Sequence, residues 1–324
     1  MSSIVRKVVM ISSFLSLHEL SARGCKELVD EGSSSAKEVT SLKSVSLSYI
    51  SKFNISTERI MLRFASSEYF NIYGWKELGS LSQTVLGLVG HRFFTVEDCP
   101  QLISVETEDE RLQLDKILGV ESLVIRDCER LNQLPEVLHA FTFLTRMRLE
   151  KGCPLLECIA QDFDETTDLE SIYISDALNI KSFPRGLDKL IHLQEIELAG
   201  CSSLVWFEES GFPATNLLVL LIFKCENFGA IPKCIHNFTS LQKLEVWKCS
   251  ADMSFPEEGF PTNLTSLEIS NGPKMYTSLV EWGLNKVTST QELNIGGEGC
   301  SRVVSFPEQG IGRMLPPSLT SICI

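Results

Sequence analysis

The chain has 324 residues, of which 44% are hydrophobic and 22% are charged, and this composition is typical of a folded protein rather than of a disordered one. Its 42 acidic and 29 basic residues give a formal net charge of -13, which argues against nucleic acids and anionic membranes as partners. The 11 cysteines include no C-x-x-C pair, which argues against zinc-ribbon and thioredoxin motifs and favours a reducing, cytoplasmic location.

The N-terminal residues contain a short basic and apolar stretch. Arg6 and Lys7 precede the apolar run 8–17, which resembles the first parts of a secretory signal peptide. Serines interrupt this run and no small-residue cleavage site follows it, so secretion is the weaker interpretation. No stretch approaches the roughly 20 apolar residues that a membrane-spanning helix needs.

From residue 17 onward, one pattern recurs to the end of the chain. Comparison of residues 217–228 with 241–249 gives the template L-x-x-L-x-I/L/V-x-x-C-x-x-L-x-x-L/F-P, and successive units are 23 to 29 residues apart. This period is that of leucine-rich repeats. The 13 units begin at Leu17, Leu42, Ser67, His91, Val120, Leu144, Leu169, Leu193, Leu217, Leu241, Leu264, Thr290 and Leu319.

Each unit is predicted to contribute one short strand. Apolar residues at the fourth and sixth positions alternate with polar ones, as in Leu123 with Ile125, and a strand with one buried face requires this alternation. One unit cannot bury these residues alone, so neighbouring units stack around a shared core. We therefore predict an α/β repeat fold over residues 1–324, a single-domain leucine-rich-repeat solenoid of horseshoe shape. Its concave side is a parallel sheet, and its convex side consists mostly of loops and short turns.

The ninth position is most often cysteine, at Cys25, Cys99, Cys128, Cys201, Cys225 and Cys249, with Cys153 displaced by one residue. One interpretation makes these cysteines small, buried groups at the turn after each strand. The other makes them redox sensors or metal ligands, which requires convergent and partly exposed thiols. We favour the first, because successive units spread the sulfur atoms along the solenoid, and we predict no metal.

Several segments depart from the template. Residues 50–86 are irregular, with Trp75 in the cysteine position, but they still fit one unit. The acidic run 106–111 is predicted to be a solvated insertion. Residues 162–165 (DFDE) resemble a calcium loop superficially but lack its glycine and distal glutamate. The last unit stops within its strand pattern, so we expect the chain to be a truncated product or part of a longer protein.

The sequence contains no motif of a known catalytic centre. The phosphate loop, the nucleophile elbow, the H-E-x-x-H zinc helix and the kinase signatures are all missing from it. The five histidines fall in different units at unrelated positions. We predict neither a catalytic residue nor a cofactor, and the chain is expected not to be an enzyme.

The concave side is the expected contact surface. The third, fifth, seventh and eighth residues of each unit should point there and are free to vary. The candidates for protein binding are Arg126, Arg146, Arg148, Tyr173, Glu195, Glu197, Leu221, Phe223, Lys243, Glu245 and Trp247. We expect a hot spot at the large or apolar members, which are Tyr173, Leu221, Phe223 and Trp247. In an alternative interpretation, the side chains of Phe223 and Trp247 fold over the sheet edge and cover neighbouring loops. A shift of one residue in the predicted strand register would turn both side chains inward.

One unit of the chain suggests a protein family. Residues 255–269 (FPEEGFPTNLTSLEI) resemble the repeat unit of plant nucleotide-binding leucine-rich-repeat disease-resistance proteins of the coiled-coil class, and residues 207–217 and 305–322 contain variants of it. The C-x-x-L-x-x-L-P ending also differs from the L-x-G-x-I-P ending of extracellular plant receptors.

This resemblance implies a cytoplasmic immune receptor whose C-terminal repeats sense a pathogen effector or a guarded host protein. They would also contact the receptor's own nucleotide-binding domain. Coiled-coil and nucleotide-binding regions are missing from this sequence, so nucleotide binding and signalling are not implied for it. Three alternatives stay open: an F-box-type or free-standing repeat adaptor, an extracellular receptor fragment supported by sequons at Asn54, Asn237 and Asn263, and a relic of a decayed gene.

Overall fold

The computed structural model describes most of the predicted repeat region. The described residues are 16–26, 41–52, 64, 67–82, 92–106, 119–132, 134, 143–151, 153–159, 163, 168–205, 207, 216–250, 253–254, 256–270, 284–296 and 315–323. Residues 8–15 of the apolar run, the sequon at Asn54, nearly all of the acidic run 106–111 and three residues of the segment 162–165 lie outside them.

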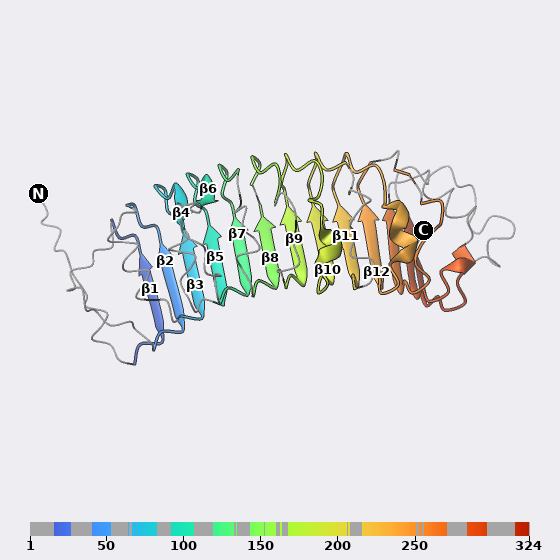
Figure 1. Cartoon of the computed structure of the whole chain (residues 1–324), viewed down its shortest axis with the longest axis horizontal. Helices are drawn as coiled ribbons and strands as arrows, with labels where there is room; N and C mark the ends of the chain where they lie inside the picture. Colours follow the sequence, from blue (N-terminus) through green and yellow to red (C-terminus); the bar gives the residue numbers. More distant parts are fainter. Residues whose placement is uncertain are drawn as a thin grey trace, which may run out of the picture.

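One parallel sheet runs the length of the described chain, with its strands side by side in sequence order (Figure 1). Within the described residues it has 13 strands. They are β1 (Glu19–Arg23), β2 (Ser44–Ser48), β3 (Tyr69–Tyr73), β5 (Phe93–Glu97), β7 (Ser122–Arg126), β8 (Arg146–Glu150), β9 (Ser171–Ser175), β10 (Glu195–Ala199), β11 (Val219–Phe223), β12 (Lys243–Trp247), β13 (Ser266–Ser270), β14 (Glu292–Gly296) and β15 (Ser321–Cys323).

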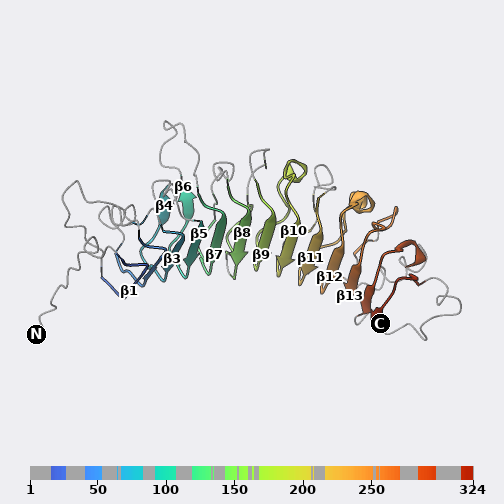
Figure 2. The same cartoon turned by 90° about the horizontal axis from the view of Figure 1, so that it is seen from below.

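The strands follow the predicted repeat register. Each begins two residues after a unit start, as β7 does at Ser122 after Val120 and β15 does at Ser321 after Leu319. Neighbouring strands pair position for position, so equivalent residues of successive units form straight rows across the sheet. The array is curved, and the sheet lies along its inner side (Figure 2). The predicted solenoid with a concave parallel sheet is thus confirmed.

The core lies behind the sheet and is continuous from unit to unit. Fourth- and sixth-position side chains are buried, as in β7, where Leu123 and Ile125 are 1% and 0% exposed. Stacking makes this possible, because each unit closes the apolar face of its neighbour. Phe70, Ile72 and Trp75 are also fully buried, so the irregular segment around β3 contributes to the same core.

The convex side of the described chain contains only short elements. They are a two-stranded parallel sheet of β4 (Ser80–Ser82) with β6 (Ser104–Glu106) and three 3-10 helices of three to five residues, η3 (Leu187–Lys189), η4 (Lys233–Asn237) and η5 (Leu284–Lys286). Pro232 comes directly before η4, and Ile231 before it is buried. Proline fixes φ and lacks an N–H group, so it suits the start of a return segment without ladder hydrogen bonds.

A left-handed turn follows most strands at the eighth position of the unit. Three of these residues are glycines, Gly24, Gly74 and Gly200, and the others are Tyr49, Asp98, Asp127, Lys151, Asp176, Lys224 and Lys248. The eighth residue was expected on the concave surface, but the structure places it in the turn at the rim of the sheet. Asparagine, aspartate and glycine suit this conformation, but lysine and tyrosine adopt it at a cost.

The ninth-position cysteines are part of the core. Cys99, Cys128, Cys201 and Cys225 are at most 1% exposed. Each thiol donates a weak hydrogen bond to the carbonyl of its own unit's seventh residue, with Sγ–O distances of 3.4 to 3.6 Å. Burial raises the pKa of Cys153 to about 12 and that of Cys249 to about 11. These are the properties of structural thiols and not of reactive ones.

Candidate functional site

The candidate site is the solvent side of the sheet. We call it the open face, meaning the side chains at the third, fifth and seventh positions of each unit. These side chains alternate with buried ones in the strands from β2 to β14, except that Ser175 of β9 and Ala199 of β10 are buried at the seventh position. All eleven predicted contact residues are on the open face. Each of the eleven is half-buried or exposed, so the register behind their selection is correct.

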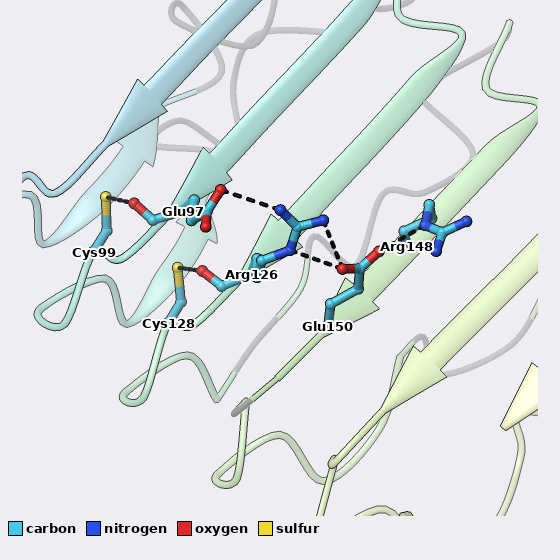
Figure 3. A network of polar contacts seen from close by, with 6 residues as sticks. All are labelled: Glu97, Cys99, Arg126, Cys128, Arg148 and Glu150. Atoms are coloured by element: carbon cyan, nitrogen blue, oxygen red, sulfur yellow. Dashed lines mark hydrogen bonds and ion pairs between the residues drawn. The ribbon is translucent and has the colours of Figure 1, made fainter. Parts of the chain in front are cut away.

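A network of charged side chains crosses the open face near its middle (Figure 3). Arg126 on β7 lies between carboxylates on both neighbouring strands, with Nη1 3.2 Å from Glu97 Oε2 and Nη2 2.6 Å from Glu150 Oε2. Arg148 on β8 donates from Nε to the other oxygen of Glu150 at 2.7 Å. Glu97, Arg126 and Glu150 are neighbours along the seventh-position row, so the parallel register itself brings opposite charges together.

Glu150 is the most enclosed member of this network. Burial acts to raise the pKa of Glu150, but the hydrogen bonds from Arg148 and Arg126 outweigh it and hold the pKa below its ordinary value. Its side chain is 12% exposed, against 47% for Arg148. Both arginines are therefore engaged within the protein, and Arg126 offers little free charge to a partner.

Arg148 also contacts the next strand. Its guanidinium carbon lies 4.4 Å from the centre of the Tyr173 ring on β9, a cation–π contact. Tyr173 is therefore held by Arg148 on one side. On the other side, the fifth-position row continues from Tyr173 to Glu197 and only then to Leu221. The structure thus separates Tyr173 from the other three members of the predicted hot spot.

The remaining members form a compact apolar group. Phe223 and Trp247 are paired neighbours on β11 and β12, and their rings stack 5.0 Å apart with an interplanar angle of 6°. Leu221 lies two residues before Phe223 on the same face of β11. All three side chains are half-buried, so they are neither part of the core nor fully solvated. The stack presents a flat apolar wall at the rim of the open face.

Carboxylates surround this apolar group. Glu195 and Glu197 lie on β10, Glu245 on β12 and Glu268 on β13. Burial, and after it the charge of Glu195, raises the pKa of Glu197 above its ordinary value. Lys243 Nζ is 2.7 Å from Glu245 Oε1. Among the described residues, this ion pair partly neutralises the negative charge of these carboxylates.

A second aromatic cluster lies on the N-terminal part of the open face and at its rim, and none of its residues is among the eleven predicted contact residues. Tyr69 on β3 and Phe93 on β5 stack 4.6 Å apart at 8°, and Tyr49 meets Tyr73 edge-on at 5.0 Å. Tyr69 is 42% exposed. The signal was present in the sequence, because Tyr69 and Phe93 both occupy the third position of consecutive units. The leucine pattern is weak in the unit of Tyr69, where Phe70 and Ile72 are the residues that fit the template.

The described residues contain no group of three or more His, Cys, Asp or Glu side chains arranged to hold a metal ion. They also contain no helix with the length and apolar character needed to cross a membrane. With one strand per unit, a 23–29-residue period and a curved parallel sheet over a stacked core, the observed architecture matches its predicted class. The fold is a leucine-rich-repeat solenoid.

Among known proteins, the chain is similar to solved structures, and this similarity concerns the fold. No protein-family model and no curated protein matches the chain. Among solved structures, the leucine-rich-repeat domain of the type III effector XopL is 18% identical, with 68% of this chain and 74% of that chain covered and a TM-score of 0.39. An internalin, InlF of Listeria monocytogenes, is 11% identical, with 97% and 88% covered and a TM-score of 0.39. The ectodomain of the receptor kinase GASSHO1/SCHENGEN3 of Arabidopsis thaliana, solved with CASPARIAN STRIP INTEGRITY FACTOR 2, is 14% identical, with 88% and 39% covered and a TM-score of 0.28.

Proposed function

We propose that this chain is the protein-recognition module of a plant intracellular immune receptor. Its open face would bind a pathogen effector or a guarded host protein, and the receptor's own nucleotide-binding domain where one is present. The resemblance of residues 255–269 to plant disease-resistance repeats supports the plant immune assignment. The open face supports the binding role.

The observation that carries the binding role is the half-buried stack of Phe223 on Trp247. Large aromatic side chains that remain partly solvated on a rigid sheet are typical of binding surfaces, because a partner can bury them at a small cost in conformational entropy. Ten of the twelve strand pairings in the described sheet span five residues, and the other two span four and three, so the platform that presents the stack is continuous. The side chains of the open face are sufficient to bind a partner protein in this way.

Affinity purification from plant tissue tests the binding role. The bait is the whole chain, compared with the double variants Phe223→Ala/Trp247→Ala and Arg148→Ala/Tyr173→Ala. The matched control, Asp188→Ala/Lys189→Ala, changes the same number of side chains on η3 of the convex side. We expect a specific partner to be retained by the wild type and the control and lost from at least one open-face variant. Identical partner sets for all four baits would contradict the proposal.

Two further measurements test the cellular assignment. A transcript from the source organism in which a phosphate-loop sequence precedes residue 1 in the same frame would support the immune-receptor role. N-linked glycan at Asn237 or Asn263 on the native protein would instead establish the extracellular alternative. In the structure the amide nitrogen of Asn263 already donates to the carbonyl of Thr239 in the preceding unit, so this side chain is engaged in stacking.

A further inference from the structure

Charge is distributed unevenly along the open face. From β5 to β8, arginines and glutamates pair with one another, as the network around Arg126 shows. From β10 to β14, five carboxylates face one ammonium group, that of Lys243, and in the described chain only Glu245 forms an ion pair with it. The five carboxylates are those of Glu195, Glu197, Glu245, Glu268 and Glu292. Among the described residues, this part of the sheet therefore has an excess of negative charge.

The carboxylates are arranged around an apolar centre. In the fifth-position row the order is Glu197, Leu221, Glu245 and Glu268, and in the third-position row Val219 lies between Glu195 and Lys243. Since adjacent strands are about 4.8 Å apart, Glu197 and Glu245 are separated by roughly 10 Å across Leu221. The stack of Phe223 on Trp247 borders this centre on one side.

Besides Lys243, the described residues place positive charge at one rim of this part of the sheet. Lys224 and Lys248 follow β11 and β12 in the left-handed turns, and Lys248 Nζ is 5.4 Å from the centre of the Trp247 ring. A cationic ligand is therefore repelled from that rim and attracted to the first and middle thirds of the strands. Arg148 faces Glu197 from the other direction and only partly offsets its charge.

We propose that the open face of β10–β13 binds a basic polypeptide segment in which an apolar side chain lies between two cationic ones. The apolar side chain rests on Leu221 and Val219 beside the aromatic stack. One cation reaches Glu197, and the other reaches Glu245, whose carboxylate it shares with Lys243. Apolar contact supplies most of the affinity, while the carboxylates select for positive charge and speed association. This inference rests on the proposed binding role and specifies the partner chemistry for one part of the face.

Fluorescence anisotropy with labelled synthetic peptides tests the proposal on the whole chain. The probe is Arg-Gly-Leu-Gly-Arg, compared with Glu-Gly-Leu-Gly-Glu and Arg-Gly-Ser-Gly-Arg. We expect the first peptide to bind and the other two to bind about five-fold more weakly or not at all, and we expect added salt to weaken the first. Equal binding of the first and third peptides would show a purely electrostatic surface and overturn the proposal, as would no binding of the first.

Variants of the chain locate the site. Glu197→Gln/Glu245→Gln should weaken the probe about five-fold, and Leu221→Ser by a similar factor, with thermal unfolding monitored by circular dichroism to show that each variant is folded. Glu19→Gln is the matched control, because it removes a carboxylate from the open face of β1 and should leave binding unchanged. If Glu19→Gln weakens binding as much as the double variant does, the site is elsewhere and the proposal fails.

The two proposals can fail separately. A tissue partner that is lost from Arg148→Ala/Tyr173→Ala but retained by Glu197→Gln/Glu245→Gln and Leu221→Ser would keep the binding role and overturn the basic-segment proposal. A partner that is lost from the glutamate and leucine variants, and that contains a basic segment protected on binding, would support both.

Discussion

The indole Nε1 of Trp75 donates a hydrogen bond to the backbone carbonyl of Leu47 at 2.9 Å. Leu47 occupies the sixth position of the preceding unit, and Trp75 occupies the ninth position of its own. The thiols of Cys201, Cys225 and Cys249 make the equivalent contact, with Sγ 3.6 to 3.9 Å from the sixth-position carbonyl of the unit before. Stacking of the units therefore places a buried hydrogen-bond donor at the turn after the strand. Either tryptophan or cysteine can supply this donor.

Removing this donor from position 75 should destabilise the protein. Trp75→Phe keeps most of the apolar volume but leaves the carbonyl of Leu47 without the indole, so we expect the free energy of unfolding to fall by about 1–3 kcal/mol. Denaturant unfolding gives this value directly. The matched control is Trp247→Phe on the open face, where the ring donates no such bond, and its effect should be small. Equal losses for the two variants would mean that the hydrogen bond contributes little.

Burial of the cysteines makes stability depend on alkaline pH. The pKa of Cys153 is about 12 in the folded protein, against an ordinary value of 9.0. The unfolded thiol therefore loses its proton first, so the contribution of Cys153 is complete below pH 9.0 and is lost as pH rises toward 12. We expect Cys153→Ala to flatten the decline of the unfolding free energy above pH 9, measured by denaturant unfolding at constant ionic strength. The same decline in both proteins would assign it to other groups.

Arg126 should contribute to stability through Glu150. Arg126→Gln removes one of two arginine donors, so the pKa of Glu150 should rise toward its ordinary value. A carboxyl group whose pKa is lowered by folding stabilises the folded protein at every pH above its ordinary pKa. This stabilisation is lost as the pH falls through the pKa of the folded protein. We therefore expect the variant to lose about 0.5–1 kcal/mol at pH 7, with a smaller difference from the wild type as pH falls below 4.5.

NMR titration of the Glu150 carboxyl carbon and denaturant unfolding from pH 7 to 3 measure both effects. Arg130→Gln is the control, because the Arg130 side chain donates to the amide oxygen of Gln101 and not to a carboxylate. A Glu150 pKa that is unchanged in Arg126→Gln would show that Arg148 alone maintains it.

Because the eighth residue of the unit adopts a left-handed turn, substitutions at Gly200 and Lys224 should change the stability of the protein in opposite directions. Gly200 has φ 65°, and a Cβ atom there would lie 2.5 Å from Asp176 Oδ1, so Gly200→Ala should cost about 1–2 kcal/mol. Lys224 has φ 56° in the next unit, where Asn tolerates the conformation better, so Lys224→Asn should stabilise by up to about 1 kcal/mol. Thermal unfolding of both variants measures the difference. A stabilising Gly200→Ala would show that the turn relaxes without cost.

The sequence by itself determined the fold, and it did so because the pattern repeats. A fourth- and sixth-position apolar pair such as Leu244 with Val246 can be buried only if neighbouring strands align in one register, and this requirement is met unit after unit. The same register predicted which side chains reach the open face, including the Phe223–Trp247 pair, without any knowledge of their contacts.

Contacts between units were decided by the tertiary structure alone. The sequence could not show that Arg148 lies over Tyr173 or donates to Glu150, because these contacts depend on the lateral spacing of strands and on rotamers. It also gave no sign that Lys224 and Lys248 adopt left-handed turns, which stacking imposes against their intrinsic preference. A periodic sequence specifies which face a side chain occupies, but its partner on the next strand lies about 24 residues away and is chosen only when the units stack.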